Sequence, residues 1–183
     1  MDFPEGRVAA VSLNYGHNFS KINIDSIRLI QDRGVLGDAH YGETVQHVHL
    51  VKKDPERANL RQVHLIASER IRGWQESGHS VNFGSLGENI TTCGLNLESL
   101  PKGSRLEFDS GTEIILMGLR KPCHQVDKFS CGLLQLTISR GESGLVTYII
   151  GVMAIISQGG EVCKGDRIKV TLPRLPHKAL VHV

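Results

Sequence analysis

Cys123 is the residue whose type and surroundings best suit chemistry. It ends the stretch of residues 118–123, in which Arg120 and Lys121 are basic, and His124 follows it directly. Nearby positive charge stabilises a thiolate relative to a thiol, and a thiolate is both a nucleophile and a soft metal ligand. These neighbours favour a reactive thiol, and a half-buried cysteine with a purely structural role is the alternative.

The other three cysteines lack such neighbours. Cys93 and Cys163 are expected to be structural, whereas Cys131 could act as a resolving thiol or pack near the start of a helix. No C-x-x-C pair occurs in the sequence. Its absence argues against a thioredoxin-type motif and a zinc ribbon.

Asp38 and His40 lie in a glycine-containing loop, residues 34–40. A carboxylate and an imidazole in such a loop can face a pocket, although Asp38 could equally cap its own turn. His47 and His49 would share one face of a strand, and a zinc site built from His40, His47 or His49 is a further possibility. Two histidines at this spacing are unspecific, and a solvated strand face explains them as well.

Two polar stretches, residues 59–64 and 87–92, lie beside apolar residues. They offer an arginine suited to anions and several hydrogen-bonding side chains, which would suit a polar ligand. Capping of turns and strand ends is the alternative for both. The sequence contains no P-loop, dinucleotide-binding, H-E-x-x-H or G-x-S-x-G pattern.

Composition narrows the class of protein. The formal net charge of +2 over 183 residues is too small to indicate a nucleic-acid or membrane-surface partner. The most apolar run, residues 145–156, is shorter than the roughly 20 residues of a membrane helix, and the first residues resemble neither a signal nor a transit peptide. We therefore expect a cytoplasmic protein with reduced thiols, no membrane span and no nucleic-acid partner.

Short β-type runs separated by turn residues dominate the chain. We expect strands at residues 7–13, 22–30, 112–119, 152–157 and 167–172. Helices are expected at residues 68–76, with Ser68 as the N-cap, and at residues 132–140, with a long irregular loop at residues 33–54. This pattern predicts one mainly β domain over residues 1–183, a closed or strongly curved barrel with two or three peripheral helices.

Several stretches, taken in order, resemble the MOSC family, which is named for the C-terminal domain of molybdenum cofactor sulfurase. The matching stretches are residues 6–12, 37–40, 59–66, 86–92, 100–103, 118–123, 151–154 and 162–166. The resemblance covers nearly the whole chain and is strongest to small stand-alone MOSC proteins. It implies a MOSC-like β-barrel in which Cys123 faces a pocket and either carries sulfur as a persulfide or ligates molybdenum in a pterin-bound cofactor.

The resemblance also assigns roles to individual residues. The implied catalytic residues are Cys123, Arg120, His40 and Asp38. The implied contacts to a molybdopterin-type cofactor are Arg61, Gln62, Glu88, Asn89, Thr91, Arg120 and Cys123, with Cys123 as the metal ligand. The leading hypothesis is a molybdenum-dependent reductase of N-hydroxylated or related small molecules.

Two alternatives stay open. Cys123 could be a metal-free sulfur carrier that cycles between thiolate and persulfide, or the domain could be a non-catalytic module that stores or delivers the cofactor. No iron–sulfur cysteine pattern is present, so a separate electron-donor protein is expected for a reductase. No pyridoxal phosphate is expected in this chain, so a sulfur carrier would need a separate sulfur-donor protein.

Overall fold

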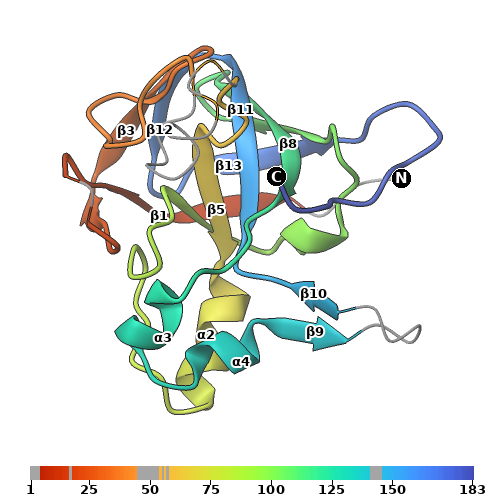
Figure 1. Ribbon diagram of the computed structural model, residues 1–183. Coiled ribbons are helices and arrows are strands. Elements are labelled where there is room, and N and C mark those ends of the chain that lie inside the picture. Colours follow the sequence, from red (N-terminus) through yellow and green to blue (C-terminus); the bar gives the residue numbers. More distant parts are fainter. Residues whose placement is uncertain (1–4, 17, 45–53, 55, 57, 141–145) are drawn as a thin grey trace.

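Seven strands close into a barrel in the computed structural model, which describes residues 5–16, 18–44, 54, 56, 58–140 and 146–183 (Figure 1). In ring order they are β1 (Gly6–Leu13), β6 (Ile90–Cys93), β5 (Val63–Ala67), β11 (Val152–Gln158), β8 (Glu113–Leu119), β7 (Arg105–Phe108) and β13 (Arg167–Thr171). The ring closes where Gly6 of β1 pairs with Ile168 of β13. Neighbouring strands are antiparallel except β5 and β6, which are parallel.

The barrel interior is an apolar core built by alternation along the strands. In β7 and β13 buried and exposed residues alternate, as expected when one face of a strand points inward. All five residues of β5 are buried. Val63, Leu65 and Ala67 join the interior core, whereas Ile66 joins a second core outside the barrel. β5 is therefore covered on both faces, and its outward side chains lie under other elements.

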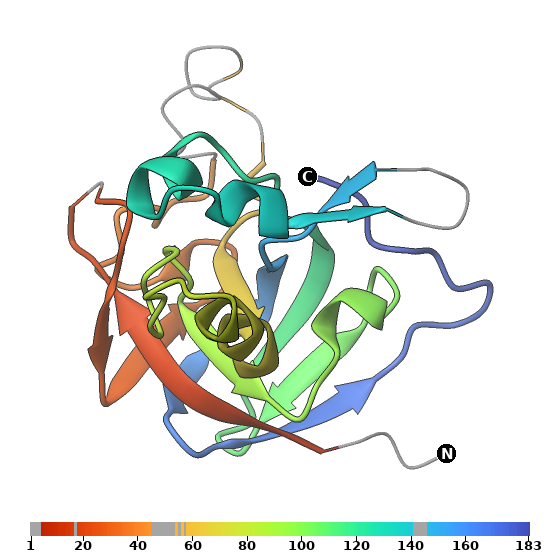
Figure 2. The same cartoon turned by 90° about the horizontal axis from the view of Figure 1, so that it is seen from below.

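The second core lies under three helices at one end of the barrel, α2 (Ser68–Glu76), α3 (Gln125–Phe129) and α4 (Leu133–Leu136) (Figures 1 and 2). Ile71 and Trp74 supply the inward face of α2, and they pack with Val126 and Leu133 of the other two helices. Burial of these side chains, rather than intrinsic propensity, holds such short helices in place. No helix in the described part of the chain is long and apolar enough to cross a membrane.

The remaining elements flank the barrel. β3 (Ser26–Ile30), β4 (Gly34–Val35) and β12 (Gly160–Cys163) form a three-stranded sheet, and β9 (Ile138–Arg140) pairs with β10 (Val146–Tyr148). β2 (Ile22–Ile24) extends the barrel sheet beside β1, and a 3₁₀ turn, η1 (Leu97–Ser99), follows β6.

The predicted fold class, a mainly β barrel with two or three peripheral helices, is confirmed. The strands expected at residues 7–13, 112–119, 152–157 and 167–172 correspond to β1, β8, β11 and β13. The helix expected at residues 68–76 is α2.

Three expectations about local structure are wrong. Residues 22–30 form two strands that divide at Asp25, because β2 pairs with β1 while β3 pairs with β12. The helix expected at residues 132–140 is a single turn, α4, and the chain then becomes β9, which pairs with β10. The N-cap of α2 is Ala67 rather than Ser68, and Ala67 has no capping side chain.

Candidate functional site

Cys123 lies in the loop that leads from β8 to α3, directly before the first turn of that helix. Its side chain is half-buried, and its Sγ lies 3.4 Å from Oε1 of Gln125. All four cysteines are free thiols, and Cys131 is exposed just before α4, so it does not provide the packing considered for it. The predicted placement of Cys123, on a loop directly after a strand, is confirmed.

Arg120 lies three positions before this thiol and is held in place by hydrogen bonds. It follows β8 directly, and its Nη1 donates to the carbonyl of Leu86 and contacts Nδ1 of His64 at 3.3 Å. Burial lowers the pKa of Arg120, whereas the charges of Cys123 and Glu88 act in the opposite direction. In the described part of the chain no carboxylate forms an ion pair with Arg120. Arg120 is thus a half-buried cation whose charge interacts with that of Cys123.

His64 fixes Arg120 from the outer face of β5. Its Nε2 lies 2.8 Å from the carbonyl of Ile150, and a carbonyl only accepts, so Nε2 carries the hydrogen and Nδ1 accepts from Arg120. Burial, with the charge of Arg120 adding to it, lowers the pKa of His64 well below its usual value. The imidazole is therefore neutral. Gly151 is required beside it, since a Cβ there would collide with His64 and the Leu65 carbonyl.

Asp38 is the centre of a second buried group. Its Oδ2 lies 2.5 Å from Nζ of Lys21, and the two side chains are only 2% and 5% exposed respectively. Its Oδ1 accepts from the backbone N–H of His40 at 3.1 Å and lies 3.3 Å from His40 Nδ1. Burial alone would raise the pKa of Asp38, but the hydrogen bond from His40 and the charge of Lys21 outweigh it and lower the pKa. Asp38 is an ionised partner of Lys21, and it also caps its own turn.

Asn89 joins the two groups. Its Nδ2 donates to Oδ2 of Asp38 at 3.1 Å and to the Ser12 carbonyl at 3.3 Å, while its Oδ1 accepts from the backbone N–H of His64 at 3.2 Å. Loops that are distant in sequence thereby become one hydrogen-bonded network outside the barrel wall. The network brings together Arg120, Asp38, His40 and Asn89, four of the residues predicted for the site.

Glu88 and Thr91, two further predicted cofactor contacts, have polar contacts within the protein. The buried carboxylate of Glu88 accepts from the backbone N–H groups of Gly84 and Leu86 at 2.6 and 3.2 Å, and burial raises its pKa. Thr91 lies 3.5 Å from that carboxylate, which leaves it at the limit of a hydrogen bond. A binding role for either residue stays a prediction.

Gln62 and Arg61 lie at different places in the fold. Gln62 Oε1 accepts from the backbone N–H of Ile156 at 2.9 Å, beside an irregularity in the β11–β8 pairing. Arg61 donates to the carbonyl of Val183. Their roles toward a cofactor also stay predictions.

Two network residues were not singled out from the sequence. Lys21 gives no local signal, because a lone lysine before a strand is ordinarily solvated. His64 ended one of the polar stretches but was assigned no role. His47 and His49 lie outside the described residues. Among the residues that are described, no three His, Cys, Asp or Glu side chains are grouped as a protein-only metal site would require.

A barrel that carries a half-buried thiol beside an arginine, both directly after one strand, defines a class of cysteine-centred β-barrel proteins. The MOSC domain family model matches residues 38–169, a range that includes both Asp38 and Cys123, and the chain belongs to this family. Lys21 lies before the matched range.

Known relatives agree with this assignment. The chain is similar to the Bacillus subtilis (strain 168) protein named "Putative metal-sulfur cluster biosynthesis proteins YuaD", with 26% identity over 145 residues that cover 75% of this chain and 76% of that protein. The crystal structure of YuaD from Bacillus subtilis superposes with a TM-score of 0.76 at 22% identity, over 93% of this chain and 97% of that one. The structure of YiiM from Geobacillus stearothermophilus gives a TM-score of 0.66 at 13% identity, over 95% and 79%. These likenesses in structure establish the fold.

Proposed function

We propose that this protein binds a molybdenum cofactor, with Cys123 as the metal ligand, and that it reduces N-hydroxylated or related small molecules. One observation carries the proposal: Arg120 is a half-buried cation three positions before Cys123, and no carboxylate among the described residues forms an ion pair with it. A cation in such surroundings favours an anion next to it, and a thiolate is the anion that its neighbour can supply.

The donor set fits a sulfur-bound molybdenum centre at Cys123. Soft thiolates suit metals that already carry sulfur ligands, and a pterin-bound metal needs few further donors from the protein. This agrees with the absence of a three-ligand cluster among the described residues. Bound there, the cofactor would supply the two-electron redox chemistry of the reduction, with electrons from a separate donor protein.

The chain's own residues would orient the reactants and hold a proton. Arg120, fixed by His64 and Leu86, would hold the anionic side of the cofactor. The side chain of His40 is 30% exposed and is oriented by the buried Asp38, so it is proposed to supply one of the two protons that the reduction consumes, the other coming from solvent. Asn89 and Glu88 would act by fixing the loop between β5 and β6, together with Thr91, whereas Arg61 and Gln62 are proposed to contact the cofactor from the start of β5.

Metal analysis tests the proposal. The protein, purified from a host that makes the cofactor, should contain molybdenum, and Cys123→Ser should remove it. Cys131→Ser is the matched control, because it deletes an exposed thiol eight positions away and should keep the metal. Folded wild-type protein without molybdenum, or equal molybdenum in Cys123→Ser, would refute this function.

A second candidate, a metal-free sulfur carrier, is favoured by the name of the relative YuaD, which refers to metal-sulfur cluster biosynthesis. The Cys123 thiolate would attack the outer sulfur of a donor persulfide. The donor's sulfur–sulfur bond breaks, the donor leaves as a thiolate, and Cys123 keeps the transferred sulfur as a persulfide stabilised by Arg120. No electrons are gained or lost overall.

Intact mass after incubation with a cysteine desulfurase and cysteine tests this second candidate. The wild-type chain and Cys131→Ser should gain one sulfur that a thiol reductant removes, and Cys123→Ser should gain none. An unchanged wild-type mass, or sulfur added equally to Cys123→Ser, would exclude it.

A further inference from the structure

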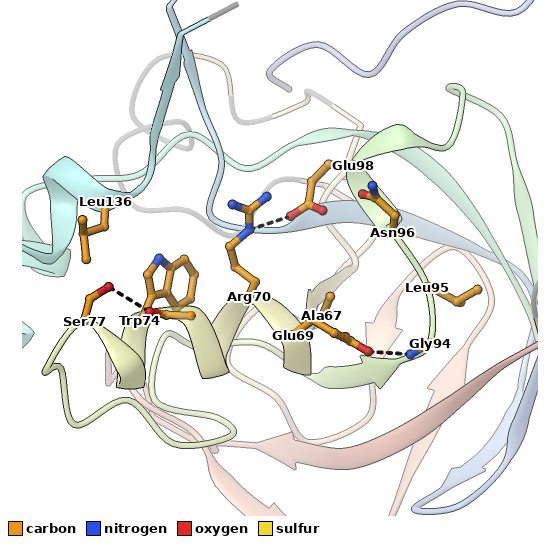
Figure 3. Close-up of a pocket in the computed structure, with 11 residues that line it drawn as sticks. Ala67, Glu69, Arg70, Trp74, Ser77, Gly94, Leu95, Asn96, Glu98 and Leu136 are labelled. Atoms are coloured by element: carbon orange, nitrogen blue, oxygen red, sulfur yellow. Dashed lines mark hydrogen bonds and ion pairs between the residues drawn. The ribbon is translucent and has the colours of Figure 1, made fainter.

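A cavity lies between α2 and the segment that contains η1 (Figure 3). Its volume of about 560 Å³ is within the range of small-molecule sites. It shares no lining residue with the hydrogen-bonded network near Cys123, which is called the Cys123 network below and consists of Lys21, Asp38, His40, His64, Asn89 and Arg120. Its walls include Arg70, Trp74, Leu95, Glu98 and Leu136.

Two buried polar atoms at this cavity have no hydrogen-bond partner, Nε1 of Trp74 and Oε1 of Glu98. Trp74 is only 2% exposed, and in Figure 3 its indole nitrogen is turned toward the end of the cavity where Leu136 lies. Glu98 has only a loose ion pair, with Oε1 3.5 Å from Nε of Arg70. Buried polar atoms are nearly always satisfied in folded proteins, so the unpaired indole N–H of Trp74 at this cavity indicates a missing partner.

Two other polar side chains of the cavity are already engaged. Glu69 accepts from the backbone N–H of Gly94 at 2.7 Å, and the Ser77 hydroxyl donates to the Gly73 carbonyl at 2.9 Å. Among the buried polar atoms of this lining, the N–H donor of Trp74 is therefore unfilled, whereas Oε1 of Glu98 has the ion pair with Arg70.

Two side chains of the lining are free to change rotamer. The side chain of Arg70 is 35% exposed, and Leu136 is 41% exposed. Exposed side chains change rotamer rapidly and without disturbing the core. The charged lining residues are Glu69, Arg70 and Glu98, which leaves the cavity with one net negative charge and disfavours an anionic ligand.

We propose that this cavity binds a small planar molecule bearing an uncharged carboxamide. The amide oxygen would accept from the Trp74 indole N–H. The indole ring, Leu95 and Leu136 would cover its apolar part. The site is separate from the Cys123 centre and does not depend on the function proposed there.

Benzamide is the simplest probe of this chemistry, and Trp74 is an ideal reporter because it is the single tryptophan of the chain. In ¹⁵N-labelled protein the one indole N–H resonance should shift saturably with benzamide at millimolar concentration. Benzoate, which lacks the donor and carries a negative charge, should leave the resonance in place. No shift with benzamide, or tighter binding of the cation benzamidine than of benzamide, would overturn the proposal.

Gly73 provides a way to close the cavity without damaging the fold. A Cβ at Gly73 would have no atom within 4 Å, so Gly73→Leu should fill space in the cavity and abolish the shift. Arg72→Leu is the matched control, because Arg72 is exposed on the same helix outside the cavity lining, and it should retain binding. Undiminished binding to folded Gly73→Leu would place the ligand elsewhere and refute the site.

Removing the donor alone tests the hydrogen bond. Trp74→Phe keeps an aromatic wall but lacks the N–H. It should weaken benzamide binding about three- to tenfold in ligand-observed saturation-transfer experiments. Equal affinity in the folded variant would show that the indole N–H does not hold the ligand.

Discussion

The Cys123 network and the cavity between α2 and η1 differ in whether their buried polar atoms are hydrogen-bonded. Around Asp38, Asn89 and His64 each buried polar side chain is bonded to another side chain or to the backbone. At the cavity, Trp74 Nε1 and Glu98 Oε1 have no hydrogen-bond partner.

This difference separates two kinds of site. The network is fully connected, so it rigidifies the loops that it joins, and within the described residues Arg120 forms no ion pair with a carboxylate. The cavity is incomplete, so its polar atoms suit a ligand from outside. Substitutions should therefore be far more costly in the network than at the cavity.

The largest difference is expected from the two carboxylates. Asp38→Asn leaves the charge of Lys21 buried without a counter-ion, and should lower the free energy of unfolding by about 3–5 kcal/mol. Glu98→Gln removes a carboxylate oxygen that lacks a hydrogen bond, and should change it by less than about 1 kcal/mol. Urea denaturation of both variants measures the two effects, and equal losses would contradict the contrast.

The next largest effect is a pH dependence that comes from His64. Its pKa is lowered in the folded state, so below the unfolded value of about 6.5 the unfolded chain binds the proton more readily. Stability should be complete above that pH and fall by up to about 1.4 kcal/mol per pH unit below it. Unfolding free energies between pH 7 and about pH 5.5 measure this slope.

His64→Gln should flatten this dependence, since glutamine can still donate to the Ile150 carbonyl and accept from Arg120. The control His177→Gln removes an exposed histidine and should keep the slope. A slope of wild-type size in His64→Gln would assign it to another group.

The smallest effect compares two glycines. Gly73→Ala, within α2 at the cavity, meets no atom within 4 Å and should stabilise the protein by about 0.5–1 kcal/mol. Gly87 in the network loop has a φ of +81°, and its Cβ would lie 2.7 Å from the Phe19 carbonyl. Gly87→Ala should therefore destabilise by more than about 1 kcal/mol. Thermal unfolding of both variants gives the signs, and the same sign in both would contradict the account.

The spacing of apolar residues predicted the strands and the helix whose formation depends mainly on their own sequence. Strong apolar runs marked β8 and β11, and the spacing of Ile71 and Trp74 marked α2. The remaining strands depend on which other strand they pair with, and the sequence pattern does not show this. Residues 22–30 form two strands because β2 pairs with β1 and β3 pairs with β12. β9 forms where a helix was predicted because it pairs with β10.

The candidate site was predictable to the extent that its chemistry is local. Adjacent basic residues marked Cys123 as a candidate, and their loop marked Asp38 and His40, and the roles of all three stay predictions. Lys21 and the neutral state of His64 depend on contacts with segments 17 and 56 residues away, respectively, which no local pattern contains.

The central claim is that Arg120 stabilises the sulfur-bound group at Cys123, and its charge can be removed while the thiol stays. In folded Arg120→Gln, the molybdenum or persulfide sulfur per chain should fall about tenfold, as expected for the loss of one close charge interaction. Lys128→Gln, which removes an exposed positive charge on α3, should keep the wild-type amount. Metal and intact-mass analysis of the three proteins side by side decides the matter: wild-type loading in Arg120→Gln would contradict the account.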